Sequence, residues 1–137
     1  LKIVPAFKLS EALGKDRLAI ANPDAVPAGK YARASLEALG VWTAVSGKVA
    51  RAENVRAALA LVSRAETPFG IVYRTDALAD KGVRIVDIFP AVTHPVIIYP
   101  IARVATSKSA SAKALVEFMK ADRTRGICEK YGFTVLK

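Results

Sequence analysis

Three short segments of the chain contain groups that can bind a small anion without carrying charge. Ala28 and Gly29 stand at an expected helix start, and Val55 follows Asn54 at another. The first N–H groups of a helix lack partners within the helix, and the helix dipole makes that end partly positive. Gly29 also has no side chain that would keep a ligand from the backbone. Tyr73 ends an expected apolar strand with a phenol hydroxyl, so the three positions predict a pocket for a small oxyanion held by neutral donors.

Residues that usually perform catalysis are scarce in this chain. His94 is the single histidine and precedes Pro95 in an expected surface loop, and the single cysteine, Cys128, is interpreted as a small core residue on a helix. No nucleophile, metal-ligand or phosphate-loop motif is present. Glu53 and Asp76 are near the expected pocket, but a carboxylate opposes a dianion, so we interpret them as capping or solvated groups. We therefore expect a binding protein that is not an enzyme and has no cofactor.

The elements that must position the donors alternate along the first half of the chain. The apolar run at residues 17–21 predicts a buried strand, and apolar spacing predicts a helix over 27–40. Asn54 is expected to cap a second helix over 55–65, and residues 69–73 predict the next strand. Helix starts and strand ends gather at one edge of a parallel sheet, where ligands bind. The three donors are therefore expected to meet at that edge.

The second half of the chain continues the alternation. Apolar runs predict strands at residues 83–89, 96–105 and 132–136. Helical spacing predicts a short helix capped by Thr75, a longer helix that begins at Ser109 or Ser111, and a last helix over 123–131. Strands and helices in regular order predict an α/β fold with a mostly parallel sheet flanked by helices.

Composition excludes several classes of protein. The chain is 53% hydrophobic and 24% charged, which is typical of a folded domain. Its net charge of +9 favours anions, but the basic residues are scattered and only 7% of residues are aromatic, so we expect no nucleic-acid partner. The longest apolar run, 95–102, is far shorter than the roughly 20 residues that cross a bilayer. Because the chain begins at Leu1 without a leader sequence, we expect a trimmed or mature product.

Several of these segments resemble the periplasmic molybdate-binding proteins of molybdate ABC transporters. The resemblance covers nearly the whole chain and rests on residues 17–23, 26–32, 53–59, 70–73 and 131–133. It implies one lobe of a two-lobed periplasmic binding protein of type II, a periplasmic location, and delivery of molybdate or tungstate to the membrane permease of an ABC importer. It also implies that Ala28 and Val55 donate from the backbone to the oxyanion and that Tyr73 donates from its hydroxyl.

The chain departs from that family in its length. The family is about twice as long, and its first lobe supplies two serines to the anion. We therefore expect residues 1–137 to be the second lobe together with a C-terminal segment that returns toward an absent first lobe, and residues 1–15 to be the lead-in. Such a lobe is expected to bind the anion weakly and to form homo-oligomers through its exposed hinge surface.

Two alternatives remain open from the sequence. The first is a truncated lobe that no longer binds the anion and mainly self-associates. The second is a receptor for another oxyanion, such as sulfate or phosphate, or for an organic acid. A buried arginine near Ala28 or Tyr73 would indicate a phosphate or carboxylate ligand, and Arg74 is the candidate.

Overall fold

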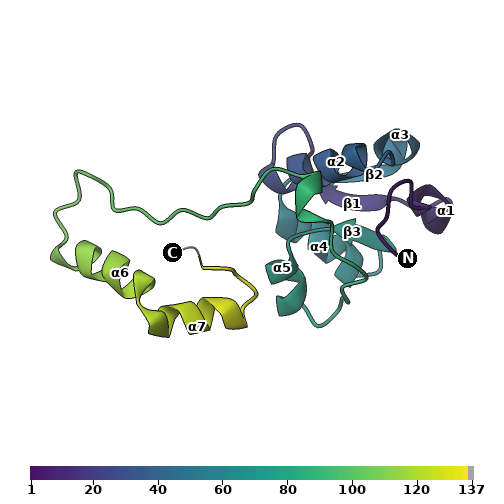
Figure 1. Cartoon of the computed structure of the whole chain (residues 1–137). Coiled ribbons are helices and arrows are strands. Elements are labelled where there is room, and N and C mark those ends of the chain that lie inside the picture. The colour runs from purple at the N-terminus through teal and green to yellow at the C-terminus, as the bar shows by residue number, and fades with distance from the viewer. Residues whose placement is uncertain (136–137) are drawn as a thin grey trace. The chain divides into compact units, whose positions relative to one another are not determined.

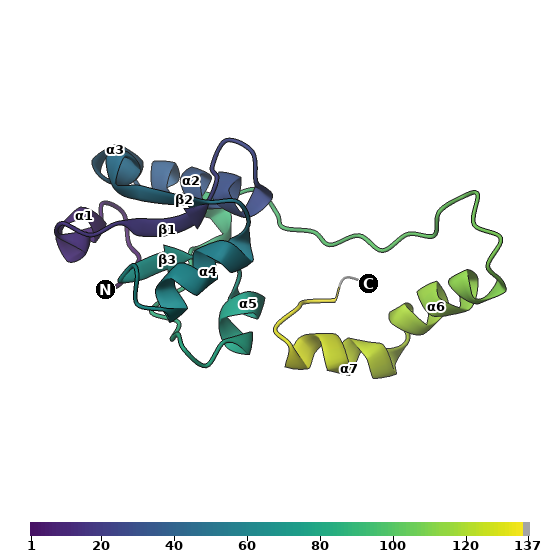
Figure 2. The same cartoon turned by 180° about the vertical axis from the view of Figure 1, so that it is seen from behind.

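A three-stranded parallel sheet organises the first part of the molecule. The computed structural model describes residues 1–135, and the chain divides into two units, Leu1–Val96 and Ile97–Lys137. The strands of the first unit lie in the order β2-β1-β3, and β1 pairs in parallel with both neighbours (Figures 1 and 2). The strands are β1 (Leu18–Ala21), β2 (Val49–Ala52) and β3 (Phe69–Ile71).

Helices connect the strands, as a parallel sheet requires. The helices of the first unit are α1 (Leu9–Leu13), α2 (Pro27–Ala38), α3 (Trp42–Val45), α4 (Val55–Ser63) and α5 (Arg74–Ala79), with short 3-10 turns η1 (Ser46–Lys48) and η2 (Ala91–Thr93). The predicted α/β class, with a parallel sheet flanked by helices, is confirmed.

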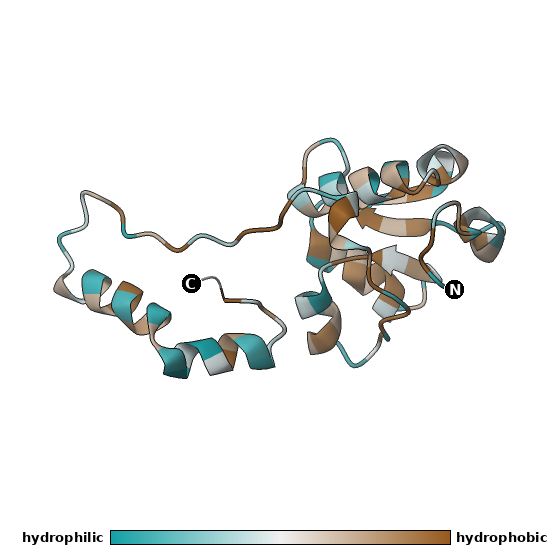
Figure 3. Cartoon of the chain, in the orientation of Figure 1, coloured by the Kyte–Doolittle hydropathy of each residue, from teal (hydrophilic) through white to brown (hydrophobic). Residues whose placement is uncertain are grey.

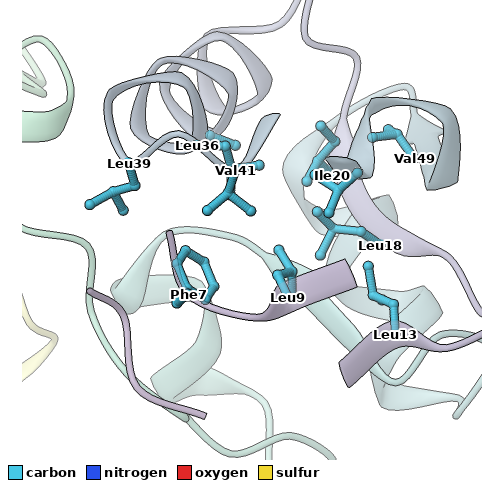
Figure 4. Packing of buried hydrophobic residues seen from close by; sticks show 11 residues of the cluster. Phe7, Leu9, Leu13, Leu18, Ile20, Leu36, Leu39, Val41 and Val49 are labelled. Carbon is cyan, nitrogen blue, oxygen red and sulfur yellow. The ribbon is translucent and has the colours of Figure 1, made fainter. Parts of the chain in front are cut away.

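The central strand β1 is buried on both faces. Leu18 and Ile20 join the larger core cluster, which α1, α2 and α3 complete (Figure 4). Ala19 points to the other face, where it meets Ala52 of β2 and Ala58 of α4. Three alanines in contact let α4 approach the sheet closely, so the continuous apolar run of β1 fits a strand covered from both sides.

The boundaries of α2 and α4 follow from local chemistry. Pro27 occupies the first position of α2, where its missing N–H costs nothing, and Gly40 follows the helix with a φ of +71°. The Asn54 side chain accepts a hydrogen bond of 2.8 Å from the Ala57 N–H and so caps α4. The predicted starts of both helices are confirmed, and α4 ends two residues earlier than predicted, at Ser63.

Residues 83–89 do not form the predicted strand. The segment has no ladder with the sheet and instead packs through single side chains. Asp87 accepts a hydrogen bond of 2.8 Å from the Ile3 N–H, and the Phe89 ring meets the Phe7 ring edge to face. Further along, the Thr93 hydroxyl lies 3.1 Å from the buried Ser35 hydroxyl of α2. Apolar alternation cannot make a strand where no neighbouring strand offers partners for the backbone.

The second unit is helical. It contains α6 (Ala110–Lys120) and α7 (Asp122–Lys130), preceded by a long segment without regular structure. The strand predicted at 96–105 is wrong, and so is the described part of the one predicted at 132–136; Leu136 lies outside the described residues. Ser109 does precede α6, as predicted, but its side chain makes no cap hydrogen bond.

The second unit has almost no core of its own. Among residues 97–135 only Thr124 is buried, and its hydroxyl bonds the Phe118 carbonyl oxygen at the turn between α6 and α7. Cys128 lies on α7 as predicted but is half-buried and not in a core. Hydrophobic and hydrophilic residues are mixed along α6, and α7 is mostly hydrophilic, whereas β1 of the first unit is hydrophobic throughout (Figure 3). Large apolar side chains are exposed along this unit: Ile98, Tyr99, Ile101, Val104, Leu115, Phe118, Ile127 and Tyr131.

Among the described residues, none of the helices has the length and apolar character needed to cross a membrane.

Candidate oxyanion site

The carboxyl ends of the three strands define one edge of the sheet. Each strand is followed there by the start of a helix: β1 by α2, β2 by α4, and β3 by α5 (Figure 2). The predicted donors Ala28, Val55 and Tyr73 lie at these three helix starts. The topology therefore places all three on the same edge, as the sequence predicted.

Ala28 is the second residue of α2 and is only 6% exposed. The first N–H group of α2 that has a backbone partner is that of Lys30, which donates to the Val26 carbonyl oxygen at 2.9 Å. Pro27 has no N–H, and within the described residues the N–H groups of Ala28 and Gly29 have no backbone acceptor. The start of α2 thus has two unused donors at its partly positive end.

Gly29 has a different role from the predicted one. A Cβ at this position would overlap the Ala21 carbonyl oxygen and lie 2.5 Å from the Asn22 carbonyl oxygen. The side of Gly29 that lacks a side chain therefore faces the end of β1. The glycine permits close packing of helix on strand, and the interpretation that it opens the backbone to a ligand is wrong.

Val55 is the first residue of α4 and is half-buried. Asn54 satisfies the Ala57 N–H with its side chain and the Ala58 N–H with its carbonyl oxygen. In the described part of the chain, the N–H groups of Val55 and Arg56 have no such partner. The Arg56 N–H is a donor that sequence reasoning missed, although it follows directly from the position of the Asn54 cap.

Tyr73 immediately precedes α5 and is half-buried. The strand β3 ends two residues earlier, at Ile71. The Tyr73 carbonyl oxygen accepts hydrogen bonds from the Asp76 and Ala77 N–H groups, both at 3.1 Å. Tyr73 rather than Thr75 therefore occupies the cap position of α5, and the prediction that Thr75 caps this helix is wrong.

One cluster of charged side chains beside the edge is paired. Asp24, in the loop between β1 and α2, lies 2.6 Å from Arg51 and 3.3 Å from Arg33. A hydrogen bond from Arg33 to Glu37, with the charges of Glu37 and Asp24, raises the pKa of Arg33. These contacts neutralise two guanidinium groups near the start of α2. Sequence reasoning missed this cluster, although the turn residues Asn22-Pro23-Asp24 mark its loop.

The other residues considered in the sequence analysis do not contribute to the three helix starts as anion ligands. Arg74 is exposed, so it is not the buried arginine that a phosphate or carboxylate ligand would require. Asp76 lies 4.0 Å from Arg56 and is partly buried. His94 is half-buried, and its Nδ1 lies 2.8 Å from the Pro95 carbonyl oxygen. Within residues 1–135 no group of three or more His, Cys, Asp or Glu side chains is arranged to hold a metal ion.

A shallow depression on α4 and α5 lies apart from the predicted donors. Its volume is about 440 Å³, and none of the three donors lines it. Two carboxylates and two basic side chains line it, so its wall carries no net charge that would favour an anion. Its lining residues are Arg56, Leu59, Ala60, Asp76, Ala79, Asp80 and Lys81.

The fold is that of one α/β lobe of a two-lobed periplasmic binding protein. A solved substrate-binding domain of a putative molybdenum ABC transporter from Clostridium difficile superposes with a TM-score of 0.74 at 28% identity, over 89% of this chain and 54% of that one. The periplasmic molybdate-binding protein of Azotobacter vinelandii also gives 0.74, at 22% identity, over 95% of this chain and 58% of its own; at that identity only the fold is shared.

The chain belongs to the family described as bacterial extracellular solute-binding protein, whose pattern matches residues 5–134. It is similar to the molybdate-binding protein ModA of Escherichia coli, 46% identical over 123 residues, and to ModA of Haemophilus influenzae, 39% identical over 123 residues. A putative ABC transporter substrate-binding lipoprotein of Bacillus subtilis, YvgL, is 37% identical over 131 residues. These matches cover 90%, 90% and 95% of this chain but 48%, 48% and 50% of the relatives, so the chain spans about half their length.

Proposed function

We propose that this chain binds a tetrahedral oxyanion, molybdate or tungstate, without catalysing a reaction. Ala28 and Val55 donate from their backbone N–H groups and Tyr73 donates from its hydroxyl. The observation that carries the proposal is that α2 and α4 both begin at one edge of the sheet, each with N–H donors that have no backbone partner. The 46% identity to a protein named for molybdate binding supports the choice of ligand.

Neutral donors suit this class of ligand. Molybdate and tungstate are dianions at neutral pH, and each oxygen accepts hydrogen bonds. Helix N-termini stabilise such charge through fixed dipoles, without a mobile cation that must be desolvated. Arg33 and Arg51 are paired with Asp24, and the proposal assigns selectivity to the geometry of the neutral donors.

The remaining parts of the proposal concern the setting of the protein. We place it in the periplasm, delivering its anion to the membrane permease of an ABC importer, because its relatives include proteins named as ABC transporter substrate-binding proteins. Residues 1–137 serve as the second lobe together with a C-terminal segment that returns toward a first lobe. The donors of residues 1–137 approach the oxyanion from one side, so we expect these residues by themselves to bind it more weakly than a site with donors on all sides.

Thermal unfolding with added anions tests the proposal. A ligand that binds only the folded chain raises the unfolding midpoint as its concentration rises. We expect molybdate and tungstate to raise the midpoint and sulfate to leave it unchanged at equal concentration. An equal shift with all three anions would mean non-selective charge screening, and no shift with any of them would remove oxyanion binding from this chain.

The Tyr73→Phe variant tests one donor. Loss of its hydroxyl leaves one ligand oxygen without a donor, which should weaken molybdate binding by about 1–3 kcal/mol. Tyr131→Phe is the matched control, because Tyr131 is exposed on the second unit. Calorimetric titration of both variants decides the matter: equal affinities in the two would exclude the Tyr73 hydroxyl from the site.

The second candidate function is self-association without anion binding. The second unit favours it, because residues 97–135 bury only Thr124 and expose a row of large apolar side chains. Size-exclusion chromatography with light scattering measures the mass directly. A dimer that the Phe118→Ser variant converts to monomer would support this candidate, and a wild-type monomer at high concentration would exclude it. A receptor for sulfate is the third candidate, and a larger shift of the midpoint with sulfate than with molybdate in the anion series above would favour it.

A further inference from the structure

Gly29 lies where α2 touches the end of β1. A Cβ at this position would overlap the Ala21 carbonyl oxygen and come within 2.5 Å of the Asn22 carbonyl oxygen, whereas real Cβ atoms essentially never approach below 3.0 Å. Both obstacles are backbone atoms and cannot rotate away. Any side chain at residue 29 therefore moves either the helix or the strand end.

The conformation of residue 29 does not itself require glycine. Its φ lies outside the left-handed region, and it stands in the first turn of a regular helix. In the interior of a helix, alanine is more favourable than glycine by about 1 kcal/mol. The glycine is thus explained by the close approach of helix and strand and not by backbone freedom.

The strand end is the more firmly held of the two partners. Asn22 donates from its N–H to the Ala52 carbonyl oxygen of β2 at 2.8 Å, and its own carbonyl oxygen accepts from Ala25 and Val26. Ala21 is fully buried. The far part of α2 is anchored by Leu36, also fully buried. A clash at residue 29 should therefore be relieved by tilting the first turn of α2.

We propose that Gly29 is a positioning residue that seats the first turn of α2 on the end of β1 and thereby fixes the direction of the Ala28 N–H. The consequence for the anion rests on the proposed function: a tilted first turn moves one of the two backbone donors out of line with the oxyanion. Gly29 itself acts through its neighbour and need not touch the ligand.

Two other glycines supply matched controls. A Cβ on Gly70 of β3 would meet Val62 Cγ2 at 2.6 Å and the Ala19 carbonyl oxygen at 3.1 Å, so Gly70→Ala disturbs the same sheet away from Ala28. Gly47 has nothing within 4 Å of such a Cβ, so Gly47→Ala makes the same chemical change in open space.

The experiment compares Gly29→Ala, Gly70→Ala and Gly47→Ala in the full chain. Unfolding midpoints without anion report stability, and calorimetric titration with molybdate reports affinity. We expect Gly29→Ala to lose at least about tenfold in affinity beyond any loss in Gly70→Ala, with Gly47→Ala like wild type. Gly29→Ala that binds as wild type, or no worse than Gly70→Ala, would overturn the proposal.

A second readout separates this proposal from the proposed function. If the wild-type chain binds no anion, the proposed function fails, and residual dipolar couplings, which report the direction of each N–H bond, then decide the positioning role alone. In Gly29→Ala the Ala28 and Lys30 couplings should change relative to wild type, while those of Val55 and Ala57 stay in place. Unchanged Ala28 and Lys30 couplings would show that α2 accepts the side chain without tilting, and the proposal would be wrong.

Discussion

The Asn54 cap of α4 gives a sharp test of how this edge is built. The Asn54→Ala variant removes the side-chain oxygen that accepts the Ala57 N–H at 2.8 Å. Because α4 has nine residues, loss of its cap affects a large part of the helix. The Val55 N–H, one of the proposed donors, belongs to the same first turn.

The size of the effect follows from the single hydrogen bond that is lost. Replacing an N-cap asparagine by alanine costs about 1 kcal/mol, within a range of about 0.5–2 kcal/mol. For a domain of about 100 residues, 1 kcal/mol corresponds to a fall in Tm of about 4–8 °C. The Asn54→Asp variant keeps the acceptor oxygen and adds a negative charge that the helix N-terminus favours, so its stability should stay within about 0.5 kcal/mol of wild type.

Circular dichroism at 222 nm through thermal and urea unfolding measures both variants against wild type. The expected order is wild type and Asn54→Asp together, with Asn54→Ala below them. Equal stability of all three would show that the cap contributes nothing, and a loss in Asn54→Asp as large as in Asn54→Ala would show that the amide group, and not the acceptor oxygen, is what matters. Either result would refute this account of the α4 start.

Two further predictions concern the packing of residues 83–93. Ser35→Ala removes a buried hydroxyl that lies 3.1 Å from the Thr93 hydroxyl and should cost about 1 kcal/mol in urea unfolding; an unchanged midpoint would contradict it. Hydrogen bonds from the Ile3 and Ile88 N–H groups lower the pKa of Asp87. The stabilising contact is therefore present above the unfolded-state pKa and is lost as the pH falls through the folded-state pKa. The protection of the Ile3 amide, which is its exchange rate relative to the intrinsic rate at the same pH, should therefore fall as the pH falls. In Asp87→Asn the protection should not depend on pH, because that side chain has no carboxyl group to titrate.

The helix starts at the candidate site could be predicted from the sequence more fully than the second half of the fold. The starts of α2 and α4 carry local signals, Pro27 at a first helical position and Asn54 as an N-cap, and both were predicted correctly. The buried strand β1 was also clear, because a strand covered on both faces is apolar at every position. Local chemistry and burial agree in this part of the chain.

The failed strand predictions share one cause: a stretch of sequence does not show whether a partner strand lies beside it. Apolar alternation at 83–89 and the run at 96–105 satisfy the pattern of a strand, but a strand exists only where a neighbour accepts its hydrogen bonds. The role of Gly29 was also missed, because its contact with Ala21 and Asn22 appears only when helix and strand are packed. A sequence pattern indicates which face of a helix or strand is apolar, but it does not identify the element that covers this face.

The pairing of β1 also determines the order of events as the chain leaves the ribosome. Its residue Leu18 pairs with Val49 on one side and Phe69 on the other, 31 and 51 residues further along. At a synthesis rate of about 5–20 residues per second, the last partner strand follows β1 by about 3–10 s. During this interval the most apolar strand of the sheet lacks at least one neighbour, and distant pairing of this kind slows folding. The apolar residues of β1 should therefore be most open to aggregation between the emergence of β1 and that of β3.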